Sequence, residues 1–158
     1  MRVCAIAILT GVLWLPLPSF ADPARIDVER AIQDIDTAHP NVKSAATTLE
    51  RRRATMNQIC GLGSSGQQQC RAENASNPDY CTCSYHAGLV SSSIAEVENA
   101  AQSTKVTVSR ARGLVDQLGD DSLRSQFSAA KARADAEIAI ADAFVDAARQ
   151  DRQRNITR

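Results

Sequence analysis

Apolar and small residues recur every three or four positions along three long stretches of the chain, a spacing typical of amphipathic helices. The clearest stretch continues this alternation for four heptads and predicts one long helix with a single packing face. Its members are Val90, Ile94, Val97, Ala101, Thr104, Val108, Ala111, Val115 and Leu118. Extended backwards, the alternation reaches Ala87 and Cys83. We therefore expect Cys83 at the beginning of the packing face.

The first stretch predicts a helix that begins after Asp22, with Pro23 in its first turn, and ends at Gly61. Asp is a favoured N-cap residue, and proline is tolerated at the first helical position. The positions expected on its apolar face are Ile26, Ala31, Ile32, Ile35, Val42, Ala45, Leu49, Met56 and Ile59. Pro40 lacks a backbone N–H and predicts a kink or a short break.

The last stretch follows "LGDDS", in which Gly119 ends one helix and Asp120, Asp121 or Ser122 can cap the next. Its apolar face is expected to hold Leu123, Phe127, Ala130, Ala134, Ile138, Ala141, Val145 and Ala148. No segment has the alternation of a strand. Because the connection between the last two helices is short, they must be antiparallel. The prediction is an all-α, elongated, antiparallel three-helix bundle with a kinked first helix.

Residues 61–83 form a Cys-rich segment, and residues 61–80 have no periodicity and many Gly, Ser, Gln and Asn residues, which predicts a long loop. The segment contains "GLGSSG", a formal match to the dinucleotide-binding motif. That motif requires a preceding strand, and here it follows a helix. We interpret residues 22–150 as one helical domain that includes this loop, and the polar residues 151–158 as a flexible tail.

The first 21 residues have the pattern of a secretory signal peptide that is cleaved on export. Arg2 precedes an apolar run from Val3 to Leu15, and Ser19 and Ala21 stand at the small positions before a cleavage site. As a helix the run would reach about 20 Å, less than the roughly 30 Å hydrocarbon core of a bilayer. We expect an extracytoplasmic protein, periplasmic or secreted, with no stable membrane span after cleavage.

Four cysteines remain after the predicted cleavage, an even number that favours disulfides in an oxidising compartment. They are Cys60, Cys70, Cys81 and Cys83. A bond between Cys81 and Cys83 would close a very small ring, so two pairings remain. One joins Cys60 to Cys83 and Cys70 to Cys81. The other joins Cys60 to Cys81 and Cys70 to Cys83. We favour the first pairing, because it clamps the ends of two helices where the loop opens.

An alternative interpretation is a Zn²⁺ or Cu⁺ site that uses Cys81, Cys83 and His86, with a further cysteine as a fourth ligand. The C-x-C spacing is unusual for zinc, and thiols in this compartment tend to oxidise. We expect no resident metal or cofactor, and we expect His86 to be a surface residue of the first helical turn. The run "ERRR", from Glu50 to Arg53, is expected to be a solvated face.

The chain has 18 basic and 18 acidic residues, and this balance argues against nucleic acid as a partner. It has two histidines and no nucleophile elbow or metalloprotease motif, so we expect no enzyme. The leading hypothesis is an exported helical protein that binds another protein, as an adaptor, assembly factor or surface or secretion-system component. A periplasmic metal-binding or redox-sensing protein and an enzyme inhibitor or chaperone-like protein are the alternatives. The helix faces also allow a homo-oligomer.

Overall fold

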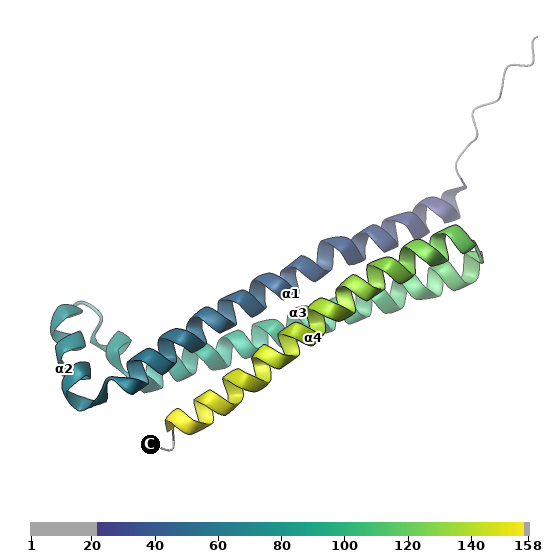
Figure 1. Ribbon diagram of the computed structural model, residues 1–158. Coiled ribbons are helices and arrows are strands. Elements are labelled where there is room, and N and C mark those ends of the chain that lie inside the picture. Colours follow the sequence, from purple (N-terminus) through teal and green to yellow (C-terminus); the bar gives the residue numbers. More distant parts are fainter. Residues whose placement is uncertain (1–21, 157–158) are drawn as a thin grey trace, which may run out of the picture.

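The computed structural model describes residues 22–156, which form four α-helices and one short 3-10 helix (Figure 1). In chain order these are α1 (Pro23–Gly61), α2 (Gly63–Glu73), η1 (Pro78–Cys81), α3 (Cys83–Leu118) and α4 (Asp121–Ile156). No strand occurs between residues 22 and 156, which confirms the all-α prediction. The structure has four α-helices where three were predicted, because α2 occupies part of the segment expected to be a loop.

The three long helices lie side by side, with α3 antiparallel to both α1 and α4, and together they form an elongated bundle (Figure 1). Helix α1 packs against both α3 and α4, and α3 packs against α4. Since α3 and α4 each have 36 residues, each is about 54 Å long at 1.5 Å per residue. Helix α2 projects at the end of the bundle where α1 stops and α3 begins (Figure 1).

The beginning of α1 agrees with the sequence prediction, but its middle does not contain a break. Asp22 accepts a hydrogen bond from the backbone N–H of Ala24 at 3.0 Å, and Pro23 lies in the first turn. The helix continues through Pro40, which is exposed. An interior proline costs about 3 kcal/mol. Ile35 and Val42 are fully buried on either side of it, and this burial holds both halves of α1 against the bundle. A kink at Pro40 stays a prediction.

The turn between α3 and α4 uses the residues that the sequence indicated. Gly119 adopts a left-handed conformation with φ of 70°, and its N–H donates to the carbonyl of Val115. Glycine is favoured there because it has no Cβ to clash. The Asp120 carboxylate then accepts from the N–H groups of Ser122 and Leu123 at 2.8 and 3.1 Å. These contacts satisfy free backbone groups at both helix ends.

The core consists of two clusters of buried side chains along the bundle. The cluster nearer α2, here called the near cluster, contains Val42, Ala46, Leu49, Met56, Ala87, Val90, Ile94, Val97, Ala101, Ile138, Ala141, Val145 and Ala148. The cluster nearer the α3–α4 turn contains Val28, Ala31, Ile32, Ile35, Val108, Ala111, Val115, Leu123, Phe127, Ala130 and Ala134. Most of the predicted apolar positions belong to one of the two clusters. Ile26 is an exception, because 40% of it is exposed.

The end of the bundle differs from the predicted flexible tail. Helix α4 continues to Ile156 and so includes most of residues 151–158. Asp151 is only 5% exposed, because its carboxylate is held against α1 by the contacts described below. The predicted signal peptide lies outside the described residues. Across residues 22–156, no helix has a stretch apolar enough to cross a membrane.

Candidate functional site

The segment between α1 and α3, residues 62–82, forms a compact element that we call the tip. Leu62, the residue between α1 and α2, has ordinary helical dihedrals, and Gly63, the first residue of α2, has a left-handed φ of 66°. Helix α2 itself buries no residue. Helical periodicity in a sequence reports a buried face, and α2 has none. This is why the sequence analysis predicted a loop here.

Two disulfides connect the tip to itself and close its base. Cys60, one residue before the end of α1, is bonded to Cys83, the first residue of α3, with a Cα–Cα distance of 4.8 Å. Cys70 in α2 is bonded to Cys81 in η1, with a Cα–Cα distance of 5.7 Å. We call Cys60–Cys83, which joins the ends of α1 and α3, the inner disulfide, and Cys70–Cys81, which lies within the tip, the outer disulfide. In sequence, the outer disulfide falls within the loop that the inner disulfide closes. The structure has the pairing that we favoured over the alternative of Cys60 with Cys81 and Cys70 with Cys83.

Local hydrogen bonds order the chain around the outer disulfide. The side-chain amide of Asn74, just after α2, donates to the carbonyl of Cys70 at 2.9 Å. Its nitrogen also lies 3.7 Å from the Cys70 sulfur and 3.8 Å from the Cys81 sulfur. Thr82 donates to the carbonyl of Asp79 at 2.7 Å and caps α3 by accepting from the N–H of Tyr85 at 3.3 Å. Thr82 therefore connects η1 to α3 directly.

His86 is buried, with 2% exposure, and the expectation of a surface residue is wrong. Its Nε2 lies 2.6 Å from the carbonyl oxygen of Tyr80, and because a carbonyl only accepts, Nε2 must carry the proton. The ring packs edge-on against Tyr80 and Tyr85, with centroids 4.9 and 5.3 Å away. The end of the tip folds back over the first turn of α3, and this contact across six residues buries a side chain that sequence spacing placed at the surface.

The two tyrosines next to His86 are partly exposed. Tyr80 is 40% exposed and Tyr85 is 38% exposed, and their ring centroids lie 6.4 Å apart. Tyrosine combines a large apolar ring with a hydroxyl, and it is enriched in protein–protein interfaces. Because Tyr80 directly precedes the disulfide residue Cys81 and Tyr85 follows Cys83 by two positions, both are anchored beside covalent cross-links. Leu62 at the base of the tip is also 40% exposed.

The alternative metal site needs thiolates from Cys81 and Cys83. In the structure both sulfurs are in disulfides, and the Nε2 of His86 is directed at a backbone carbonyl. A disulfide sulfur carries no thiolate charge with which to hold Zn²⁺ or Cu⁺. The part of the chain that the structure describes contains no group of three His, Cys, Asp or Glu residues that could hold a metal ion.

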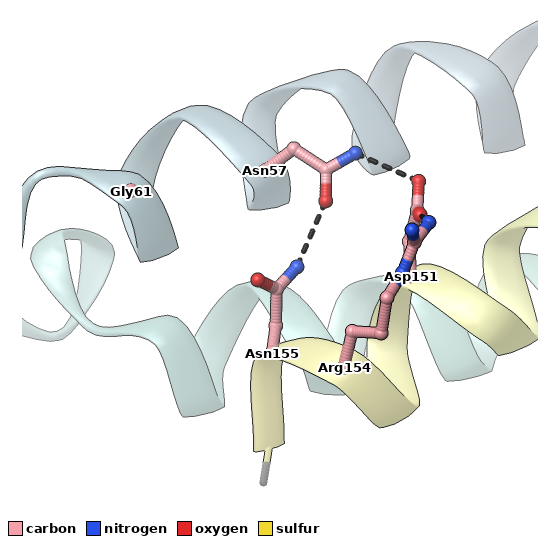
Figure 2. Close-up of a pocket in the computed structure, with 5 residues that line it drawn as sticks. All are labelled: Asn57, Gly61, Asp151, Arg154 and Asn155. Atoms are coloured by element: carbon pink, nitrogen blue, oxygen red, sulfur yellow. Dashed lines mark hydrogen bonds and ion pairs between the residues drawn. The ribbon is translucent and has the colours of Figure 1, made fainter. Parts of the chain in front are cut away.

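A polar pocket of about 260 Å³ lies beside the base of the tip, between the end of α1 and the end of α4 (Figure 2). It is lined by Asn57, Gly61, Asp151, Arg154 and Asn155. The Asn57 amide donates to Asp151 at 2.8 Å and accepts from the Asn155 amide at 2.8 Å (Figure 2). These residues link the last turns of two helices that are distant in sequence. Sequence analysis missed them, because a single polar residue on a helix carries no periodic signal.

The Asp151 carboxylate is the most strongly perturbed acid of this pocket. Arg53 donates to it at 2.6 Å, and Arg154 forms a further hydrogen-bonded ion pair with it. Burial would raise the pKa of Asp151, but the hydrogen bonds from Asn57, Arg53 and Arg154 outweigh burial and lower the pKa to about 2. Such a carboxylate is ionised at neutral pH and is a very weak base. The arrangement holds α4 on α1, and it offers no poised acid or base.

The arginines of "ERRR" are not all part of a solvated face. Arg53 pairs with Asp151 and Glu50, and Arg52 donates to Ser93 of α3 at 2.6 Å. Both are half-buried. Ser93 itself is fully buried, so its contact with Arg52 satisfies a hydroxyl inside the bundle. Two of the three arginines therefore connect α1 to its neighbours, and Arg51 is exposed.

Comparison with known proteins provides no functional assignment. No protein-family model, no curated protein and no solved structure matches this chain.

Proposed function

We propose that the protein is exported, is not an enzyme, and binds another protein through its tip, as an adaptor, assembly factor or surface component. The observation that carries the proposal is that the tip is cross-linked by two disulfides although its helix contributes nothing to the buried core. Two disulfides hold it in shape, yet α2 adds no buried residue to the bundle. A segment that is covalently ordered without serving the core is well suited to present a surface.

The exposed tyrosines indicate where on the tip a partner would bind. Binding hot spots are enriched in Tyr, Trp and Arg that are held in place before association. Tyr80 and Tyr85 are partly exposed, lie near each other, and stand next to disulfide-bonded cysteines. Little side-chain and backbone freedom would be lost when a partner covers them. The same argument does not apply to exposed Val106 in the middle of α3, which lies apart from both disulfides.

Export is supported by the two disulfides together with the leader-like pattern of residues 1–21. Structural disulfides persist in oxidising compartments. N-terminal sequencing of the protein isolated from its native host tests this part of the proposal. We expect a chain that begins at Asp22. A retained leader with four free thiols in the isolated protein would contradict it.

Site-specific photo-crosslinking in the native host tests the binding site. A photoreactive amino acid replaces Tyr85 in one full-length variant and Val106 in another, because both side chains are exposed and they lie on the same helix. We expect the photoreactive residue at position 85 to form one cross-linked product with a single partner protein. Adding the substitution Tyr80→Ser should abolish this product. Equal adducts from both positions would contradict binding through the tip and would instead favour a helix face.

A further inference from the structure

The tip has almost no apolar interior of its own. From Leu62 to Thr82 the buried residue is Cys81, which is 0% exposed. Helix α2 makes its main contacts with η1, and η1 contacts α3. The hydrogen bonds of Asn74 and Thr82 are local. The Cys70–Cys81 bond is therefore the central packing contact of the tip as well as its cross-link.

The inner disulfide has a different environment. Cys60 packs against the near cluster of the core. The Cys83 sulfur lies 3.8 Å from the backbone oxygen of Asn155 in α4. Residues from all three long helices thus surround the Cys60–Cys83 bond. Opening it requires movement within the bundle, whereas opening the outer bond requires movement of the tip alone. Local unfolding of a weakly packed element costs less than unfolding of the core.

The two cysteines of the outer bond differ in burial, and the Asn74 amide nitrogen lies beside both of their sulfurs. Cys70 is half-buried, whereas Cys81 is completely buried. Of this pair, Cys70 is the less buried residue, so an external thiolate is expected to attack its sulfur, with Cys81 as the leaving group. Cys60 and Cys83 are half-buried as well, so the packing around each bond, and not residue exposure, distinguishes the two disulfides. The Asn74 amide nitrogen lies 3.8 Å from the Cys81 sulfur. A donor at this position stabilises the thiolate that forms when the bond breaks, and exchange is faster when the leaving thiolate is more stable.

We propose that Cys70–Cys81 is a thiol–disulfide exchange site that controls whether the tip is folded, while Cys60–Cys83 and the bundle stay intact. A dithiol reductant attacks Cys70 through one thiolate, the Cys70–Cys81 bond breaks, and Cys81 leaves as a thiolate that takes up a proton. The second thiol of the reductant then attacks the mixed disulfide and releases Cys70 as a thiol. The reductant becomes a disulfide, and its two electrons and two protons reside on Cys70 and Cys81.

This inference goes beyond partner binding, because it concerns the fold of the tip and needs no partner. The test treats the mature oxidised protein with dithiothreitol at neutral pH, traps free thiols with iodoacetamide at intervals, and maps the modified cysteines by mass spectrometry. We expect Cys70 and Cys81 to be modified at least about tenfold faster than Cys60 and Cys83, in line with the free-energy range of local and global opening. Equal rates, or earlier opening of Cys60–Cys83, would overturn the proposal.

Hydrogen exchange in two matched double variants gives the structural readout. In C70S/C81S we expect the amides of residues 63–81 to lose at least about tenfold of their protection, while those of residues 87–115 and 130–148 keep theirs. The comparison variant C60S/C83S retains the outer bond and should keep protection within residues 63–81. Retained protection of the tip in C70S/C81S, or its loss in C60S/C83S alone, would refute a redox-controlled tip. The dithiothreitol measurement on the unmodified protein decides the matter if a variant fails to fold.

Discussion

The bundle and the tip occupy the same chain but are stabilised in opposite ways. In the bundle, each long helix buries a row of apolar side chains, and two clusters of 13 and 11 buried residues extend along it. In the tip, Cys81 is the one buried residue between positions 62 and 82. The bundle is stabilised by removal of apolar surface from water, and the tip by covalent bonds and local hydrogen bonds. Mutation should therefore damage the bundle through packing and the tip through its cysteines.

The largest expected effect comes from a cavity in the near cluster. Leu49 is 0% exposed within it, so Leu49→Ala should lower the free energy of unfolding by about 2–5 kcal/mol. Urea denaturation followed by circular dichroism measures this. The matched control is Leu62→Ala, at a leucine that is 40% exposed at the base of the tip, where we expect a change within about 0.5 kcal/mol. Similar losses in both variants would show that the tip is packed like the bundle.

An intermediate effect is expected at Asp151, where the bundle meets the base of the tip. The pKa of this carboxyl is lowered from 3.8 to about 2 in the folded protein. As pH falls, the unfolded chain takes up the proton first, so this stabilisation is complete above about pH 4 and is lost as pH falls through 2. A shift of this size corresponds to about 2 kcal/mol. Asp151→Asn should be less stable at pH 7 by a similar amount.

The measurement is urea denaturation of both proteins at pH 7 and at steps from pH 4.5 to 2. Other carboxyl groups contribute to acid destabilisation in both proteins, so the informative quantity is the difference between them. We expect the difference in free energy of unfolding between the native protein and Asp151→Asn to decrease as pH falls below 4. A difference that stays constant to pH 2 would indicate that the charge of Asp151 does not stabilise the contact between α4 and α1.

The smallest effect is expected for an exposed ion pair near the other end of the bundle. Arg133 of α4 contacts both oxygens of Asp36 of α1 at 2.8 and 2.9 Å. The two side chains are 52% and 41% exposed, and exposed pairs contribute at most about 1 kcal/mol. Arg133→Ala should therefore lower stability by less than about 1 kcal/mol, and 1 M NaCl should reduce the difference. A larger loss that salt does not reduce would point to packing by the arginine stem instead.

The heptad pattern predicted the bundle well, because burial along a straight helix depends on local spacing. Every predicted seam position of α3 from Ala87 to Val115 is buried, and so is every predicted position of α4 from Leu123 to Ala148. The Asp22 cap and the Gly119 turn were also predicted from local chemistry, whereas the cysteines left two pairings open, of which the structure has the favoured one. The spacing of apolar residues gave a wrong prediction where a helix has no buried face or where a regularly spaced apolar residue is exposed. Helix α2 has helical backbone without a buried face, and Ile26 has helical spacing without a neighbour that covers it.

The order of apolar and small residues by itself determined that the chain is helical, where the long helices lie, and which face of each is buried. These properties follow from contacts within a few residues and from the hydrophobic effect. Only the tertiary structure decided that η1 covers His86 and that Asp151 meets Arg53 and Asn57. Those contacts join positions that are far apart in the chain or outside any repeat, and their geometry depends on how the helices and the disulfides bring them together.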